Sequence, residues 1–254
     1  MPLELPTLLA LLAAAFLAGA VDAIGGGGGL IMVPALLACG LPPHLALGTN
    51  KGQSFVGSLA ATVRFARAGM VDRSRARVTF PLAFVGSLAG TALVLIVRPE
   101  VLRPLVLVLL ITAAVVVTLM HPRQEGQAPS GRRAAWIAAA IALIVGAYDG
   151  FFGPGAGTFY IAGFVAFLGL TTARASADAK VANFASNFAA MLLFAVRGDV
   201  IWAISLPLAA GQLLGGWVGA HMVVRRGDSL VRIVVLIVVI ALVIKVGRDL
   251  YLSH

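Results

Sequence analysis

Long apolar runs alternate with short basic stretches along this chain. The longest runs cover residues 102–120, 134–147, 201–224 and 233–244. A helix needs roughly 20 apolar residues to cross about 30 Å of hydrocarbon. Backbone groups in lipid must be hydrogen-bonded within their own segment, so these runs are expected to be helices rather than strands. The pattern predicts an all-α polytopic membrane protein.

The composition supports the same class. Of the 254 residues, 60% are hydrophobic and only 11% are charged, which is too apolar for a water-soluble globule. Residues 1–23 end in small residues, as a secretory signal does, but they carry Glu4 and no Lys or Arg, so we interpret them as a retained first span. Cys39 is the only cysteine, and no Cys/His cluster has the spacing of metal ligands. The sequence therefore predicts neither a metal nor a cofactor.

The net charge of +9 comes from arginines that cluster between the apolar spans. Basic loops of membrane proteins face the cytoplasm, which explains the charge without a nucleic-acid partner. The three clusters are Arg64, Arg67, Arg73, Arg75 and Arg77; Arg123, Arg132 and Arg133; and Arg225, Arg226 and Arg232. We expect a multi-pass protein of the cell (inner) membrane with both termini outside the cytoplasm.

The chain consists of two related halves. Residues 46–71 align with residues 175–200 at a constant offset of 129, which pairs Lys51 with Lys180. With small changes of offset, Asp22 pairs with Asp149, the Gly-rich segment 25–29 with 153–157, and residues 86–87 with 211–212. We predict a first transmembrane repeat at 1–122, a cytoplasmic linker at 123–133 and a second transmembrane repeat at 134–254.

In each half, the Gly-rich break is followed by an apolar piece too short to span the membrane upright. These pieces, residues 30–39 and 158–170, are expected to be re-entrant or half-helices. Each half contains an odd number of elements, so the second half is expected to lie upside down relative to the first. Inverted repeats with interrupted segments are typical of transporters that bind substrate near the membrane midplane. The site is therefore predicted at the interface between the repeats.

The Gly-rich breaks have two compatible interpretations. They allow close packing of helices, and they let the chain turn inside the membrane so that the N–H groups of the next half-helix face an anion. A nucleotide-binding loop is excluded because no flanking strand and no Lys-Ser/Thr pair is present. The candidate anion-binding positions are Gly27, Gly28, Gly29, Gly155, Ala156 and Gly157.

Two repeat-equivalent lysines, Lys51 and Lys180, stand just inside the helices that follow the short segments. An intramembrane charge is costly and usually faces a cavity or a partner, although a lysine near a helix end can also extend to the interface. Two such cations from inverted halves are expected to converge and hold an anion between them. Polar residues on the same helices form either a substrate path or helix-helix contacts: Asn50, Gln53, Ser54, Asn183 and Asn187.

Three carboxylates are candidates for ion coupling. Asp178 lies two residues from Lys180 and is expected to be its partner and a proton-coupling group. Asp22 and Asp149 precede the breaks and are expected either to cap the half-helices or to handle protons.

At these residues the sequence resembles the TauE/SafE sulfite exporter family, also called the toluene-sulfonate uptake permease family. Residues 25–34, GGGGGLIMVP, and residues 41–51, LPPHLALGTNK, carry the resemblance, and the second half repeats them in degenerate form. Residues 86–92 and 211–220 resemble the small-residue helix of the family. The resemblance covers nearly the whole chain. It implies secondary transport of sulfite, sulfonates, thiosulfate or related small anions across the bacterial cytoplasmic membrane, coupled to an ion gradient.

The leading expectation is therefore a secondary transporter that exports small sulfur-containing anions with ion or proton coupling. The alternatives are an anion channel and a transporter of small carboxylates. An intramembrane enzyme would need a nucleophile–base pair or a metal cluster, which the four histidines do not form, so we predict no enzymatic activity. The expected partners are the anion, membrane lipids and, in a homo-oligomer, further copies of the chain.

Overall fold

The computed structural model describes residues 5–98, 129–237 and 240, and every regular element in these ranges is a helix. This confirms the all-α fold class. The helices with defined bounds are α1 (Leu5–Gly25), α2 (Gly28–Ala38), α3 (Pro43–Arg67), α4 (Arg73–Ile96), α6 (Gly131–Phe151), α7 (Ala156–Leu168), α8 (Thr172–Val196) and α9 (Trp202–Arg226). The predicted span at 102–120 lies outside the described residues, and the one at 233–244 lies partly outside them.

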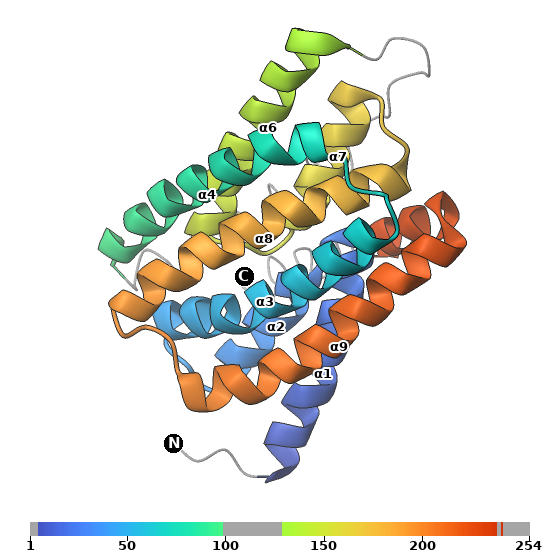
Figure 1. Cartoon of the computed structure of the whole chain (residues 1–254). Coiled ribbons are helices and arrows are strands. Elements are labelled where there is room, and N and C mark those ends of the chain that lie inside the picture. Colours follow the sequence, from blue (N-terminus) through green and yellow to red (C-terminus); the bar gives the residue numbers. More distant parts are fainter. Residues whose placement is uncertain (1–4, 99–128, 238–239, 241–254) are drawn as a thin grey trace.

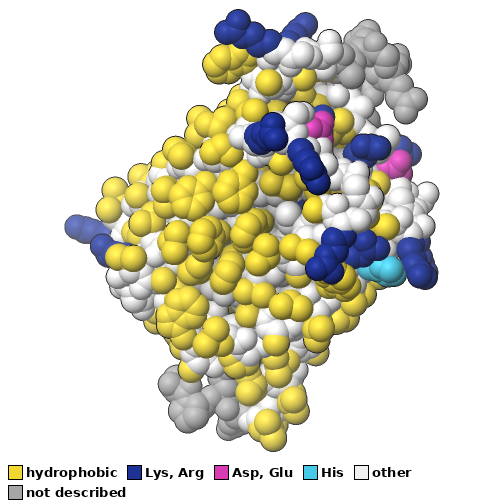
Figure 2. Space-filling view, viewed as in Figure 1, with side chains coloured by type: hydrophobic (Ala, Val, Ile, Leu, Met, Phe, Trp, Pro, Cys, Tyr) yellow, Lys and Arg dark blue, Asp and Glu magenta, His cyan; other side chains and the backbone are white. Residues whose placement is uncertain are grey.

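Five of these helices, α1, α4, α6, α8 and α9, are long and apolar enough to cross a membrane. Hydrophobic side chains cover much of the face shown in Figure 2, and most of its Lys and Arg side chains lie in the upper and right-hand parts. The chain is thus a multi-pass membrane protein. The two short apolar helices, α2 with 11 residues and α7 with 13, confirm the short segments predicted at 30–39 and 158–170.

The helices of the two halves follow each other in the same order and with similar lengths. Helices α1 and α6 each have 21 residues, α3 and α8 each have 25, and α4 and α9 have 24 and 25. In Figure 1, α3 and α8 lie side by side near the centre and run in opposite directions. The inverted orientation of the halves across a bilayer stays a prediction. The predicted linker at 123–133 falls mostly outside the described residues, and α6 begins at Gly131, near its end.

The halves interlock through their outer helices. Helix α1 packs against α9, and α4 packs against α6, so the first span of each half lies against the other half. Small residues make these contacts close: a Cβ on Gly86 or Gly90 would overlap backbone atoms of α6. Helix α8 is central, with 67% of its most apolar window buried, against 39% for both α1 and α4.

Basic residues gather at the end of the molecule where α3 and α9 finish and where α4 and α6 begin (Figures 1 and 2). At this end Asp72 caps α4, and its carboxylate accepts hydrogen bonds from the backbone N–H groups of Ser74 at 2.9 Å and Arg75 at 3.1 Å. A hydrogen bond from the Ser74 hydroxyl, together with the Arg75 backbone bond and charge, lowers the pKa of Asp72. The cap therefore stabilises the fold in its ionised form.

Replacing Asp72 by alanine should lower the free energy of unfolding by about 1 kcal/mol, because two N–H groups at the start of α4 lose their acceptor. Thermal unfolding in detergent measures the loss, and Asp72→Asn, which keeps an acceptor oxygen, should lose less. Because the folded-state pKa is lowered, the ionic part of this stabilisation is present at neutral pH and disappears as the pH falls through that value. A deficit of Asp72→Asn that grows on acidification would contradict this assignment.

Candidate functional site

Two ion pairs connect the halves inside the helical bundle. Lys51 on α3 donates to the Asp149 carboxylate on α6 at 2.5 Å, and Lys180 on α8 donates to the Asp22 carboxylate on α1 at 2.8 Å. Each lysine therefore pairs with the aspartate of the other half. The exchange is reciprocal, because Lys51 and Lys180 are repeat-equivalent and so are Asp22 and Asp149.

The Asp149 carboxylate is the more fully bonded of the two. Besides Lys51, it accepts hydrogen bonds from the Asn183 amide at 3.1 Å and from the Ser186 hydroxyl. Lys51 also donates to the Asn187 side-chain oxygen at 3.0 Å. Both charged side chains are only 2% exposed. In a buried pair of this kind, removing either side chain would leave the other charge buried without a counter-charge, which is strongly destabilising.

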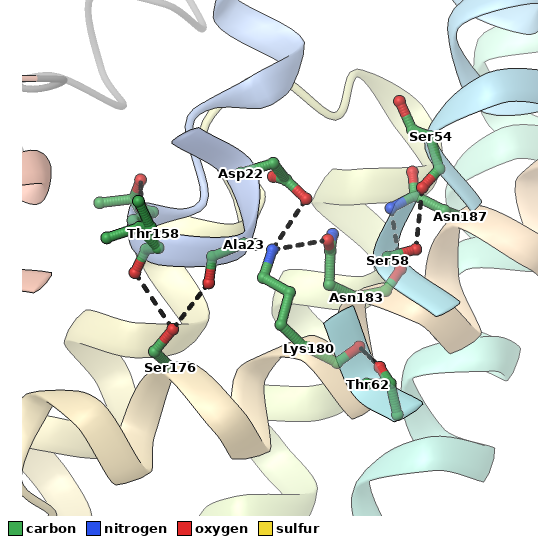
Figure 3. A network of polar contacts seen from close by, with 12 residues as sticks. Asp22, Ala23, Ser54, Ser58, Thr62, Thr158, Ser176, Lys180, Asn183 and Asn187 are labelled. Atoms are coloured by element: carbon green, nitrogen blue, oxygen red, sulfur yellow. Dashed lines mark hydrogen bonds and ion pairs between the residues drawn. The ribbon is translucent and has the colours of Figure 1, made fainter. Parts of the chain in front are cut away.

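Asn183 joins the two ion pairs into one network. Its side-chain oxygen accepts a hydrogen bond from Lys180 at 3.2 Å, and its amide nitrogen donates to Asp149. Figure 3 shows Lys180 between Asp22 and Asn183. Lys180 is fully buried, whereas the Asp22 side chain is 16% exposed. The two lysines were predicted to converge, and the structure connects them through one polar network.

The two Gly-rich breaks meet beside this network. A Cβ on Gly157 at the start of α7 would lie 2.5 Å from the Cα of Gly26, which has a φ of +80°. The Thr158 hydroxyl donates to the backbone oxygen of Gly25 at 2.7 Å, and the Ser176 hydroxyl donates to that of Ala23 at 3.0 Å (Figure 3). The breaks are buried against each other. This is expected because lipid offers no hydrogen-bond partner to the backbone N–H and C=O groups that a break leaves free.

Asp22 and Asp149 do not cap the half-helices, so the first of the two alternatives for these residues is wrong. Gly27 and Gly155 are the cap residues of α2 and α7, and neither cap has a side-chain hydrogen bond within the described residues. The lysines attract both carboxylates instead. Asp22 still lies beside the start of α2, because its carboxyl carbon is 3.2 Å from the position that a Cβ on Gly28 would take.

The candidate anion-binding positions, five glycines and one alanine, occupy this junction. All but one are buried, Gly29 being half-buried against Pro154. The positions concerned are Gly27, Gly28, Gly29, Gly155, Ala156 and Gly157.

Among the described residues, the polar side chains predicted on α3 form no hydrogen bond with either ion pair. The Ser54 hydroxyl donates to the Asn50 side-chain oxygen at 3.3 Å, and both residues remain on one face of α3. Gln53 is fully buried, and neither of its amide atoms has a hydrogen-bond partner among the described residues. On α8, by contrast, Asn183 bonds to Lys180 and Asp149, and Asn187 bonds to Lys51.

The expected pairing of Asp178 with Lys180 is wrong. Asp178 forms an ion pair with Arg75 and accepts a hydrogen bond from the backbone N–H of Asp72 at 2.9 Å. Residues two apart on a helix point to different sides. Asp178 therefore faces the connection between α3 and α4, at the basic end of the molecule.

The candidate site residues did not include Ser186 or Gln212. Ser186 lies three residues after Asn183 on the same face of α8, a spacing that signals a shared face, but its bond to Asp149 depends on how α6 packs. Gln212 has serine as its repeat equivalent, so no matched residue type pointed to it. Its amide nitrogen is buried without a partner among the described residues. In the same part of the chain, no group of three His, Cys, Asp or Glu side chains could hold a metal ion.

Comparison with known proteins agrees with the geometry of a polytopic bundle. The sequence profile of the family "Sulfite exporter TauE/SafE" matches residues 11–246. The chain is 41% identical over 244 residues to the "Probable membrane transporter protein YfcA" of Escherichia coli strain K12, covering 94% of this chain and 88% of that protein. It is 36% identical over 251 residues to a "Probable membrane transporter protein" of Haemophilus influenzae, covering 98% of both chains.

More distant similarity extends to plants. A part of the chain, 36% of its length, is 34% identical to 21% of the "Sulfite exporter TauE/SafE family protein 5" of Arabidopsis thaliana. No solved structure matches the chain. The bacterial relatives are named as membrane transporters and not as enzymes. The profile match and the two full-length bacterial relatives show that this chain belongs to the TauE/SafE sulfite exporter family of membrane transporters.

Proposed function

We propose that the protein is a secondary transporter that exports small sulfur-containing anions, such as sulfite, organosulfonates or thiosulfate, with ion or proton coupling. Family membership supports the sulfur-containing class of substrate. The observation that carries the proposal is the pair of buried lysines, each neutralised by an aspartate of the other half. Such groups inside a membrane protein mark a substrate or ion path.

Lys180 is the proposed anion-binding cation. It is fully buried, yet its carboxylate partner Asp22 is partly exposed, so an incoming oxyanion can replace Asp22 on the lysine without leaving a buried charge unpaired. Asp22 also lies beside the start of α2, where the N–H groups of Gly28 and Gly29 favour negative charge. A substrate that takes the place of this carboxylate would meet the same donors.

Coupling follows from the same exchange. When Asp22 takes up a proton it becomes neutral, Lys180 loses its counter-charge and an anion can bind in its place. Release of that proton restores the ion pair and expels the anion. One proton then moves in the same direction as each anion, so export in this scheme is driven by the outward gradient of the anion. In this proposal Asp149 keeps Lys51 neutralised, and Asp178 takes no part in coupling because Arg75 holds it.

The proposed orientation uses the basic ends of the helices. We place the end that carries Arg64, Arg67, Arg73, Arg225 and Arg226 in the cytoplasm of the cell, with the protein in the inner membrane. Helix α1 begins at the opposite end in Figure 1, which supports an N-terminus outside the cytoplasm.

Replacing Lys180 by glutamine should reduce sulfite flux at least tenfold, because the site loses the cation proposed to hold the substrate while Asp22 remains. Proteoliposomes loaded with labelled sulfite, with and without a pH gradient, measure the flux. Lys180→Arg, which keeps the charge, should retain part of it.

The wild-type measurements separate the alternatives. Saturable flux that a pH gradient drives indicates a coupled carrier, and flux that never saturates indicates a channel. Sulfoacetate, thiosulfate and acetate, tested in the same way, define the substrate class. Wild-type flux in Lys180→Gln, or transport of acetate with no transport of any sulfur anion, would refute the proposal.

A further inference from the structure

The two reciprocal ion pairs are chemically unequal. Three side chains, those of Lys51, Asn183 and Ser186, donate to the Asp149 carboxylate, which is 2% exposed. Among the described residues only Lys180 donates a side-chain bond to Asp22, which is 16% exposed. One half of the network is therefore saturated with hydrogen bonds, and the other half retains free acceptor capacity.

The sequence explains this difference. Asn183 and Ser186 on α8 have Ser54 and Gly57 on α3 as their repeat equivalents. Ser54 donates to Asn50 instead of to a carboxylate, and Gly57 has no side chain. The Asp22 side of the network thus lacks the two donors that hold Asp149.

Two unpartnered amides lie on this same side. Gln212 of α9 packs between α1 and α3: a Cβ on Gly19, one turn before Asp22, would lie 3.1 Å from the Gln212 Cα, and a Cβ on Gly57 would lie 2.8 Å from the Gln212 side-chain oxygen. Gln53 lies on α3, one turn before Gly57. Gln212 is 2% exposed and Gln53 is 0% exposed. The amide nitrogens of both have no hydrogen-bond partner among the described residues.

In the described part of the Lys51–Asp149 side of the network, no buried side-chain amide lacks a hydrogen-bond partner. The repeat equivalents of Gln53 and Gln212 are Ala182 and Ser87, and the Ser87 hydroxyl donates to the backbone oxygen of Ser186 at 2.6 Å. Buried amide donors without an acceptor are costly and call for a polar ligand in the functional state. The amide nitrogens need a hydrogen-bond acceptor, and they lie next to the helix that carries the weakly held Asp22. A ligand that replaces Asp22 on Lys180 must be negatively charged. An oxyanion supplies both the acceptor oxygens and the charge.

We propose that the transported oxyanion binds on the α1–α3–α9 side of the network, with Lys180 as its cation and the amide nitrogens of Gln212 and Gln53 as further donors. The Lys51–Asp149 pair is then a fixed brace that does not exchange with substrate. This assignment rests on the proposed function, and it makes the site one-sided although the halves are repeats.

The test compares Gln212→Met with Ser87→Ala, the substitution at the repeat-equivalent position, in proteoliposomes with sulfite as the probe. Methionine keeps the length of the side chain and removes the donor. Loss of a hydrogen bond to a charged ligand should raise the KM for sulfite roughly ten- to hundredfold. The maximal rate should stay within about twofold of wild type, and Ser87→Ala should leave the KM unchanged.

Gln53→Met supplies a second, independent variant on another helix, should Gln212→Met fail to fold. A raised KM in either variant supports the one-sided site, and an unchanged KM in the variants that fold overturns it while the proposed function stands. If the wild-type protein transports none of sulfite, sulfoacetate and thiosulfate, the proposed function fails and this inference fails with it. A merely structural role of the amides would lower the unfolding temperature without changing the KM, which also overturns the inference.

Discussion

Replacing Asp149 by alanine is expected to destabilise the protein severely. The substitution leaves Lys51 buried without its counter-charge and also removes the acceptor of Asn183 and Ser186. Loss of one partner of a buried ion pair costs about 3–5 kcal/mol. Thermal unfolding in detergent, followed by the fraction of monodisperse protein, measures the effect.

Two comparisons make this result specific. Replacing both members of the pair, in Lys51→Met/Asp149→Leu, removes the stranded charge and should restore most of the lost stability. Asp22→Ala should cost less than Asp149→Ala, because Asp22 is partly exposed and has fewer donors. If Asp149→Ala unfolds at the wild-type temperature, the Lys51–Asp149 pair is not the brace that we infer.

The second large effect is expected from Gly26→Ala. Gly26 has a φ of +80°, and its new Cβ would overlap backbone atoms of Gly157 and Thr158, which no side-chain rotation can relieve. The unfavourable φ costs about 1–2 kcal/mol, and overpacking adds roughly 1–3 kcal/mol more. The junction of the two Gly-rich breaks should open, with a lower unfolding temperature and loss of transport.

Gly40→Ala is the matched control for this prediction. Gly40 has a φ of +83°, so it bears the same backbone cost, but a Cβ there would meet nothing within 4 Å. The difference between the two variants isolates the contact between the breaks. Equal unfolding temperatures for Gly26→Ala and Gly40→Ala would show that the breaks do not need this close approach.

Features that depend on local sequence could be predicted, and features that depend on packing between the halves could not. The apolar pieces at 30–39 and 158–170 differ from α2 and α7 by only one or two residues at each end, because glycine turns and apolar length are local signals. The predicted partner of Lys180 was wrong because the prediction relied on the nearness of Asp178 in the sequence. The actual partner, Asp22, comes close only when α1 packs near α8.

The repeat comparison had a similar limit. It identified Lys51 with Lys180 and Asp22 with Asp149, since these residue types match. It did not single out Gln53, which was predicted only as a polar residue near Lys51, or Gln212, because their equivalents Ala182 and Ser87 are of other residue types. A self-comparison finds what the halves share, and the two unpartnered amides are a place where they differ.

The reciprocal ion pairs also bear on the origin and assembly of the chain. In a dimer of two identical half-length subunits related by a two-fold axis, each subunit's aspartate would pair with its neighbour's lysine, as an isologous interface requires. The exchange between Lys51–Asp149 and Lys180–Asp22 preserves that arrangement after gene duplication. Because of this exchange, Lys51 and Asp22 cannot form their ion pairs until the second half has been synthesised and inserted. In both ion pairs the lysine and the aspartate come from different halves, so each half depends on the other to neutralise its buried charges. The two halves must therefore fold together.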